Sequence, residues 1–459
     1  MMLTGIGLYV IAQLAISVWA ARRTRSETDY LLAGRTLGPL AIGMSIFATW
    51  FAVEGIVATS GLVAEEGLSG ALFDPIGLGL GIIAFALLVA GPIRRGQNVM
   101  LSGFLGARFG TLSESLAGFI VCASAIIWSS VQILALAVLL ASISSLSIFG
   151  GLMLATTLVL VYTMLGGLLG DIVTDMVQGA VLALGLVICL VLIIGMGGGA
   201  EAALVAIPAE RTDRLISEDP LSSAEVFLSA LATSIAGAEL AGRTLGARSA
   251  AVARNGALIG GGIYLTVGAM PVLFGLLGPQ LGLDLPVGDG YLPAMIKTLM
   301  PTWLQVVFMG ALLSAIFSTV DSALLAVSAV ATESVYRRLR PAAGEREGLV
   351  IARLTTVGAG VLAFFIAAYG ESIRTLALQG ASVGGCLLVP VLLGVLTKSG
   401  GERGAPASII VGFSILFWLQ WLHPVTGAFL YAVAGALLAY VVAELPKNRR
   451  PSPGVPEDF

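Results

Sequence analysis

The chain has 459 residues, of which 57% are apolar and only 11% are charged, and its mean hydropathy is +0.99. This composition excludes a soluble globular protein, and the net charge of −3 adds little to the argument. A helix needs roughly 20 mostly apolar residues to cross a bilayer, and such windows recur along the whole chain. The sequence therefore predicts an all-α polytopic membrane protein.

Thirteen apolar windows follow one another along the chain, separated by charged residues, glycine and proline. Each is long enough to cross a bilayer as a helix. We predict spanning helices at 3–20, 37–60, 71–91, 112–142, 147–165, 172–195, 222–241, 256–278, 302–334, 350–369, 374–397, 404–422 and 425–444.

The basic residues support this number of spans. An odd number places the two termini on opposite sides, and Lys and Arg collect in cytoplasmic loops. With thirteen spans, all but four of the 24 Lys and Arg residues fall on one side; the exceptions are Arg211, Arg214, Lys297 and Arg374. We therefore expect a multi-pass protein of the cell membrane with its N-terminus outside and its C-terminus in the cytoplasm.

The two ends of the chain and the cysteines point to no separate function. The first window has no basic segment before it, so we interpret it as a span and not as a signal peptide. Cys122, Cys189 and Cys386 fall inside spans, far apart, and are expected to be small core residues. The tail 445–459 is short, charged and Pro-rich, and we expect it to be disordered.

In the second window, Trp50 and Glu54 stand one helical turn apart and would face the same region. Trp50 lies near the middle of the span, which argues against an interface anchor, while core packing stays open as an alternative. Glu54 is an ionisable group within a span, and such groups are functional candidates by default. A position in the outer vestibule is the alternative for Glu54.

The ninth window contains the segment "AIFSTVDSALL", Ala315 to Leu325. At roughly 100° per residue, Ser318, Thr319 and Ser322 converge on one side of a helix. Asp321 points away from them, and its burial needs a partner or a water-filled path. Hydroxyl and carbonyl oxygens without a fixed carboxylate suit a hard monovalent cation. The alternative is that the hydroxyls bond to carbonyls one turn earlier or join helices.

The longer stretch "GALLSAIFSTVDSALLAVSAVATESVY" resembles the signature helix of the sodium:solute symporter family. Two further stretches resemble the same family in the same order: "DYLLAGRTLGPLAIGMSIFATW", and "YTMLGGLLGDIVTDMVQG" at 162–179. The thirteen-span pattern agrees with them, so the resemblance covers nearly the full chain.

The resemblance implies a LeuT-like fold, in which two groups of five helices repeat with inverted topology and extra helices flank them. It also implies Na+ as the coupling ion, alternating access as the mechanism, and no organic cofactor. The implied units are an extra N-terminal helix and loop at 1–36, the first repeat at 37–195, an extracytoplasmic loop at 196–221, the second repeat at 222–397, two extra helices at 398–444 and the tail at 445–459.

In this family the coupling sodium lies between the first helix of repeat one and the third helix of repeat two. The resemblance implies that Ser318 and Thr319 offer their hydroxyls and Ala315 its carbonyl. Ala48 and Phe51 would offer carbonyls from an unwound stretch in "FATWFAVEG".

Two acidic residues have open roles. Asp175 in "VTDMVQG" matches an acidic position that the family uses near the ion's route to the cytoplasm, and capping of a helix start is the alternative. Glu239 either adds an acid near the substrate or pairs with Arg243, four residues on, and we favour the salt bridge.

The phrase "ATW" with Trp128 in "AIIWSSVQILALA" resembles the choline-transporter branch, in which two tryptophans help to enclose a quaternary ammonium. Aromatic faces attract a desolvated cation, and Glu54 would assist. The third aromatic of that branch is missing from "ALATSIAGAELAGR". We therefore expect import of a small polar solute with an ammonium group, such as an amino acid, betaine or a choline-like compound. A sugar or a carboxylate such as pantothenate is the alternative.

Other classes fit less well. An enzyme would need a reactive constellation, and the single histidine, His423, has no paired metal ligand in the sequence. The stretch "GLGLG" at 77–81 lies within a span and predicts close helix packing. A receptor or sensor that binds the solute without transport stays open. The expected partners are a small-molecule substrate and the lipid bilayer, without nucleic acid.

Overall fold

A computed structural model describes residues 35–96, 100–165, 168–282, 285–286, 288–342, 344–397 and 400–445, together with Gly7 and Ile11. Within this part of the chain every regular element is a helix, apart from one parallel bridge between Leu37 and Ala247. The all-α prediction is therefore confirmed there. The predicted first span and the tail beyond Leu445 lie outside the described residues, Gly7 and Ile11 excepted.

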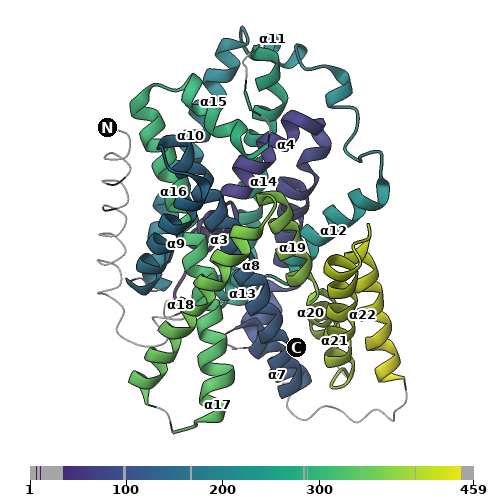
Figure 1. Ribbon diagram of the computed structural model, residues 1–459. Helices are drawn as coiled ribbons and strands as arrows, with labels where there is room; N and C mark the ends of the chain where they lie inside the picture. Colours follow the sequence, from purple (N-terminus) through teal and green to yellow (C-terminus); the bar gives the residue numbers. More distant parts are fainter. Residues whose placement is uncertain are drawn as a thin grey trace.

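The helices follow the order of the hydropathy windows (Figure 1). The first half contains α3 (Pro39–Trp50), η2 (Glu54–Ala58), α4 (Thr59–Glu66), η3 (Gly67–Ala71), η4 (Leu72–Gly77), α5 (Leu78–Leu88), α6 (Ala90–Arg95), α7 (Leu101–Phe109), α8 (Thr111–Ile143), α9 (Ile148–Leu165), α10 (Leu168–Met196), α11 (Ala200–Val205) and η5 (Ala209–Arg211). The second half contains α12 (Pro220–Ile235), α13 (Ala238–Leu245), α14 (Ala250–Leu277), η6 (Gly278–Leu281), η7 (Gly288–Gly290), α15 (Tyr291–Leu299), α16 (Thr302–Ala329), η8 (Val330–Tyr336), α17 (Arg337–Leu339), α18 (Glu345–Tyr369), α19 (Ile373–Gly385), α20 (Leu388–Leu396), α21 (Gly404–Phe417), η9 (Trp418–Leu422) and α22 (Ala428–Glu444).

The lengths of these helices fit a membrane-spanning bundle. In the described part of the chain, nine helical segments are long and apolar enough to cross a bilayer. Three shorter apolar helices, Pro39–Trp50, Ile148–Val161 and Ala428–Glu444, fall within other predicted spans. Each predicted span from the second to the thirteenth therefore has a helical counterpart.

Two of the predicted spans are interrupted inside the bundle. Helix α3 ends at Trp50, Phe51 leaves the helical region with φ −87° and ψ 72°, and helical structure resumes at Glu54. In the second half, α12 ends at Ile235, and Gly237, with φ −64° and ψ 113°, precedes α13. Free backbone groups are tolerated at such depth only where protein or a cavity satisfies them, so interruptions mark candidate binding sites.

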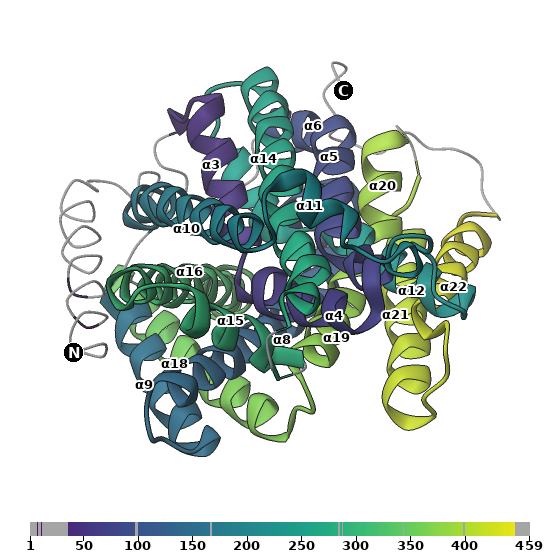
Figure 2. The ribbon, with the colours of Figure 1, turned by 90° about the horizontal axis from the view of Figure 1, so that it is seen from above.

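The first interruption lies among long helices. Helix α3 packs against α10, α14 and α16, and the residues around its interruption are buried. Figure 2 shows α10 and α14 beside α3, whereas α21 and α22 stand together at one edge of the bundle. The core thus surrounds the interrupted helix, and the C-terminal pair lies outside it.

The two ends of the bundle are named here by the helices that lie there. Helices α11 and α15 lie at the upper end in Figure 1, here named the α11 face, and α7 and α17 lie at the lower end, named the α7 face. Lys297, one of the four basic residues that the sequence separated from the rest, lies in α15 and so belongs to the α11 face. The assignment of the α7 face to the cytoplasm stays a prediction.

The stretch "GLGLG" packs closely, as predicted. A Cβ atom placed on Gly77 would lie 2.6 Å from Ala230 Cβ, and one on Gly79 would lie 2.4 Å from Leu265 Cδ2. On Gly81 it would lie 2.5 Å from Ser234 Cβ and 2.8 Å from the Leu231 carbonyl oxygen. The absence of side chains here lets α5 approach α12 and α14.

We therefore expect Gly81→Ala to lower the free energy of unfolding by about 1–3 kcal/mol, because the new methyl group meets backbone that cannot move aside. Thermal unfolding of the detergent-purified protein measures this change. Gly262→Ala on α14 is the control, because no heavy atom lies within 4 Å of the added Cβ. Equal stability of the two variants would contradict the close packing of α5.

Candidate functional site

The interruption of α3 faces the hydroxyl of Thr319 on α16. Thr319 Oγ1 lies 3.0 Å from the Ala315 carbonyl oxygen and 3.2 Å from the Thr49 carbonyl oxygen. The last carbonyls of a helix have no partners within it, and they form the negative end of its dipole. Phe51 N–H satisfies one of them, that of Phe47. Hydroxyl and carbonyl oxygens therefore gather where the helix dipole favours a cation.

The predicted sodium ligands lie around this point. Ala48 and Phe51 flank Thr49 on the interrupted helix and are buried, as is Ala315 on α16. Ser318 lies on α16 beside Thr319, but its side chain is outside the described part of the structure. Oxygen donors of this kind fit a hard monovalent ion, and the described residues contain no group of three or more His, Cys, Asp or Glu that could hold a metal.

A buried polar network continues from the interruption towards α10. Asp175 Oδ2 accepts hydrogen bonds from Ser45 Oγ at 3.1 Å and from Thr49 Oγ1 at 3.3 Å. It also lies 3.6 Å from the guanidinium of Arg243, which donates to Ser322 Oγ at 2.9 Å. Asp175 is fully buried and Arg243 is 4% exposed. Asp175 therefore joins α3, α10, α13 and α16.

This network changes the sequence-based interpretation of Arg243. The spacing favoured a salt bridge from Glu239 to Arg243, but the guanidinium instead makes its ion pair with Asp175. Glu239 lies in the first turn of α13, where a carboxylate is stabilised by the positive end of the helix dipole. The four-residue spacing of Glu239 and Arg243 describes contacts within one helix only. It could therefore not reveal that the partner of Arg243 lies on α10.

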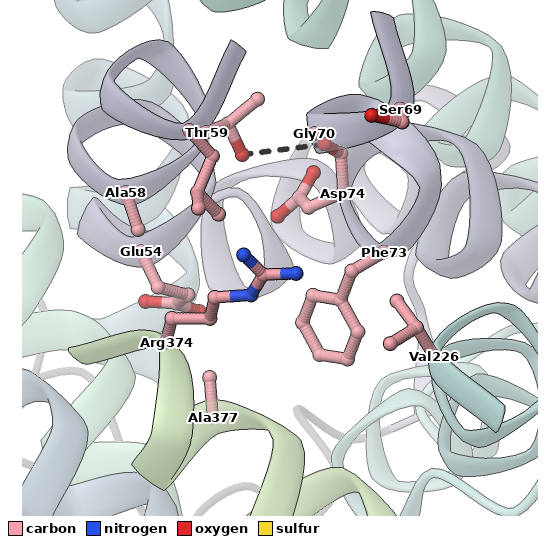
Figure 3. A pocket seen from close by; sticks show the side chains of 11 residues that line it. Glu54, Ala58, Thr59, Ser69, Gly70, Phe73, Asp74, Val226, Arg374 and Ala377 are labelled. Atoms are coloured by element: carbon pink, nitrogen blue, oxygen red, sulfur yellow. Dashed lines mark hydrogen bonds between the residues drawn. The ribbon is translucent and has the colours of Figure 1, made fainter. Parts of the chain in front are cut away.

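Beyond the interruption lies a cavity that contains two carboxylates (Figure 3). It is small, with a volume of about 20 Å³, roughly the space of one water molecule. We name it the carboxylate cavity; its wall includes Glu54, Thr59, Phe73, Asp74, Val226 and Arg374.

The carboxylate of Glu54 is held in place from α8. Glu54 is 5% exposed, and Gln132 Nε2 donates a hydrogen bond to its Oε2. Glu54 is therefore buried in the bundle, and its role at a substrate site or in an outer vestibule stays a prediction. It lies at the start of η2, on the far side of the interruption from α3.

Asp74 is a functional candidate that the sequence interpretation missed. It is 3% exposed, with extended backbone (φ −133°, ψ 126°) inside η4. Its Oδ2 accepts a hydrogen bond from Tyr264 at 2.9 Å, and its carbonyl accepts one from Thr59 at 3.2 Å. An ionisable residue within the predicted span 71–91 was the signal that could have identified it.

The two tryptophans that the sequence singled out lie outside the carboxylate cavity wall. Trp50 packs at the second interruption, where a Cβ on Gly237 would lie 2.8 Å from Trp50 Cζ2. Trp128 packs on α19, where a Cβ on Gly380 would lie 3.3 Å from its Nε1. Trp50 and Glu54 do not share a helix face, because α3 ends between them.

Polar contacts join three of the elements near the cavity. Arg374 pairs with Glu66 at 2.7 Å, and Asp289 accepts the Ile373 N–H at 3.4 Å. Burial raises the pKa of Asp289, more than this N–H bond lowers it, and Glu65 adds to the rise. These contacts connect α4, η7 and α19.

Two interrupted helices in contact inside a spanning bundle, with oxygen donors at one interruption, define a class of membrane transporters. The model of the sodium:solute symporter family matches residues 30–412, and the chain belongs to this family. It is therefore a membrane transporter, as the sequence implied.

Known relatives agree along nearly the whole chain. The chain is 28% identical to the high-affinity proline transporter PutP of Bacillus subtilis, over 97% of this chain and 98% of the relative. It is 26% identical to the sodium/pantothenate symporter of Escherichia coli, over 95% and 94% of the two chains. It is also 26% identical to the high-affinity choline transporter 1 of Torpedo marmorata, over 90% of this chain and 75% of the relative.

Solved structures show the same fold. A Na+-coupled sialic acid symporter in a substrate-bound outward-open state matches with a TM-score of 0.82, at 18% identity, over 98% of this chain and 99% of that one. A nucleobase-cation-symport-1 family transporter in a closed conformation matches with a TM-score of 0.60, at 14% identity, over 92% and 95%. The LeuT-like fold that the sequence implied is therefore confirmed.

We expect Arg243→Gln to lower the free energy of unfolding by about 3–5 kcal/mol, because it leaves the Asp175 carboxylate buried without its ion-pair partner. The double variant Asp175→Asn with Arg243→Gln should recover part of this loss. Denaturant unfolding of the unchanged protein, Arg243→Gln, Asp175→Asn and the double variant measures the coupling.

The matched control is the same set of unfolding measurements on the pair of Arg374 and Glu66, where the coupling between the two residues should be small. Both side chains are about one-third or more exposed, and exposed pairs contribute roughly 0–1 kcal/mol. Additive effects of the two buried substitutions would contradict a direct interaction between Asp175 and Arg243.

Proposed function

We propose that this member of the sodium:solute symporter family imports a small polar organic solute with an ammonium group, such as an amino acid, betaine or a choline-like compound. The observation that carries the proposal is the interruption of α3, with hydroxyl and carbonyl oxygens at one end and the carboxylate cavity at the other. Sodium would bind at the first and the solute at the second.

The proposed sodium ligands are the carbonyls of Ala48, Phe51 and Ala315 and the hydroxyls of Ser318 and Thr319. The contact of Thr319 with the Thr49 carbonyl supports this placement, because it brings α16 against the end of α3. A sodium ion between the two helices would draw them together, so binding stabilises the arrangement in which they are close.

Asp175 is the proposed acid on the ion release path. Thr49 supports this role, because its carbonyl faces Thr319 while its hydroxyl donates to Asp175. An ion leaving the site towards Asp175 would meet the guanidinium of Arg243 as a competitor for the carboxylate. Release would then require the ion pair to separate, which makes Arg243 part of the gate.

Glu54, Trp50 and Trp128 are the proposed substrate-binding residues. Glu54 lines the carboxylate cavity directly. Trp128 packs on α19 about one turn from Ala377, which also lines the cavity, and Trp50 packs against the second interruption. The tryptophans would contact the solute only if the helices that carry them move during transport.

Coupling follows from linkage between the two sites. Each ligand favours the transport-competent state only by its higher affinity for that state, and the effect is reciprocal. With the α7 face in the cytoplasm, as the basic residues predict, the membrane potential adds about 2.3 kcal/mol per charge per 100 mV to import.

Two alternatives have specific tests. A solute carboxylate, as in pantothenate, would need a free cation, whereas Arg374 is already paired with Glu66. A receptor that binds without transport would respond to solute but move none into vesicles. Uptake of labelled solute into proteoliposomes with a sodium gradient, compared with a potassium gradient, separates the transporter from the receptor.

We expect Thr319→Ala to raise the sodium concentration for half-maximal transport by roughly tenfold, the equivalent of one lost ligand oxygen worth about 1.4 kcal/mol. Ser318→Ala should act in the same direction. Sodium titration of uptake in proteoliposomes measures both.

Ser328→Ala is the control on the same helix, because Ser328 Oγ bonds to the Leu325 carbonyl at 2.9 Å, within α16. Its sodium dependence should remain that of the unchanged protein. If Thr319→Ala and Ser318→Ala also keep that dependence, the proposed sodium site is wrong.

A further inference from the structure

We infer that the carboxylate cavity selects substrates with a net positive charge whose ammonium group carries at least one N–H. The inference rests on the proposed function and narrows its substrate class to cations with an N–H ammonium, such as basic amino acids and amines. Neutral amino acids, betaine and choline-like compounds fall outside this narrower class. Asp74 and Glu54 would hold the ammonium, with Tyr264 and Gln132 as positioning residues.

The first argument is the closeness of the two acids. A Cβ on Gly55 would lie 2.5 Å from Asp74 Oδ2, so only glycine lets the backbone next to Glu54 come this near. Glu54 and Asp74 come from η2 and η4, and both side chains enter the same cavity (Figure 3). Two carboxylates are thus directed at one small space.

The second argument concerns two buried oxygen atoms that have no hydrogen-bond partner. Asp74 Oδ2 accepts from Tyr264, but Asp74 Oδ1 is buried and has no hydrogen bond. Gln132 donates its amide N–H to Glu54, and its buried Oε1 also has no partner. Buried polar atoms are nearly always hydrogen-bonded in native proteins, so these acceptors call for a donor.

The third argument is the balance of charge. Around the cavity stand three carboxylates, Glu54, Asp74 and Glu66, and one guanidinium, Arg374, which is paired with Glu66. Buried charges without counterions are strongly disfavoured. A cationic ligand would supply the missing positive charge. A zwitterion would also bring a carboxylate, and Arg374, the cation at the cavity wall, is already paired with Glu66.

The shape of the cavity selects among cations. Its wall has one aromatic ring, Phe73, beside aliphatic side chains such as Val226 and Leu62. A quaternary ammonium is typically held by several aromatic faces, whereas an N–H ammonium can donate to the free carboxylate oxygen. At about 20 Å³ the cavity has room for the ammonium group alone, so the rest of the solute would occupy space that opens when the surrounding helices move apart.

The test compares ligands that share a carbon skeleton. Prolinamide and glycinamide are cations, proline and glycine are the matching zwitterions, and N-trimethylated glycinamide is the quaternary cation. Binding to the purified full-length protein is measured by isothermal titration calorimetry at constant sodium. Sodium binding without any ligand is measured separately by thermal shift.

We expect both amides to bind at least about tenfold more tightly than the parent amino acids and the trimethylated amide, as one charge-assisted hydrogen bond would produce. Asp74→Asn and Glu54→Gln should each remove about tenfold of the amide affinity. Glu218→Gln, an exposed carboxylate paired with Arg214, is the control and should leave it unchanged.

The outcomes separate this inference from the proposed function. A sodium response with no preference for the amides, or with unchanged amide affinity in Asp74→Asn, overturns the inference and leaves the symporter standing. If sodium produces no thermal shift in the unchanged protein, the proposed function itself is overturned. Because the ligand preference is measured on the unchanged protein, it decides the matter even if a variant fails to fold.

Discussion

The structure depends on one constraint: a backbone that leaves the helical conformation inside a membrane bundle must find other partners for its polar groups. Helix α3 meets this constraint where it ends, next to Phe51. The Thr319 hydroxyl of α16 donates to the Thr49 carbonyl, and Asp175 of α10 accepts a hydrogen bond from the Thr49 hydroxyl. One interruption therefore produces two different environments. The carbonyl end of α3 favours a cation, and the segment that follows begins with Glu54 and opens on the carboxylate cavity.

The second interruption completes the arrangement. Gly237 lies between α12 and α13 and packs against Trp50, the last residue of α3. A side chain at position 237 would collide with the indole, so the close approach of the two interrupted helices requires a glycine there. This contact joins the two halves of the chain. A movement of one half against the other would therefore displace the end of α3, which lies next to both candidate sites.

Four of the buried charged residues form two groups that differ in how their charge is balanced. Asp175 and Arg243 compensate each other within the protein, so their pairing can hold helices together and can be released. Glu54 and Asp74 have the same sign and leave acceptor oxygen unpaired. A compensated pair suits a gate, whereas an uncompensated pair suits a ligand that brings the opposite charge. The two groups lie on opposite sides of the α3 interruption.

The sequence by itself determined the helical class, the order of the spans, the glycine packing at 77–81 and the polar segment on α16, because hydropathy and spacing are local properties of the chain. It singled out Glu54 as an ionisable group within a span and, through the family resemblance, Asp175 as an acid near the ion's route. Only the tertiary structure paired Arg243 with Asp175, separated Trp50 from Glu54, and brought Asp74 to Glu54. These features depend on where a helix stops and on which distant helices pack beside it. No periodicity within one span encodes contacts of that kind, since a buried charge is satisfied by whatever group the fold places next to it.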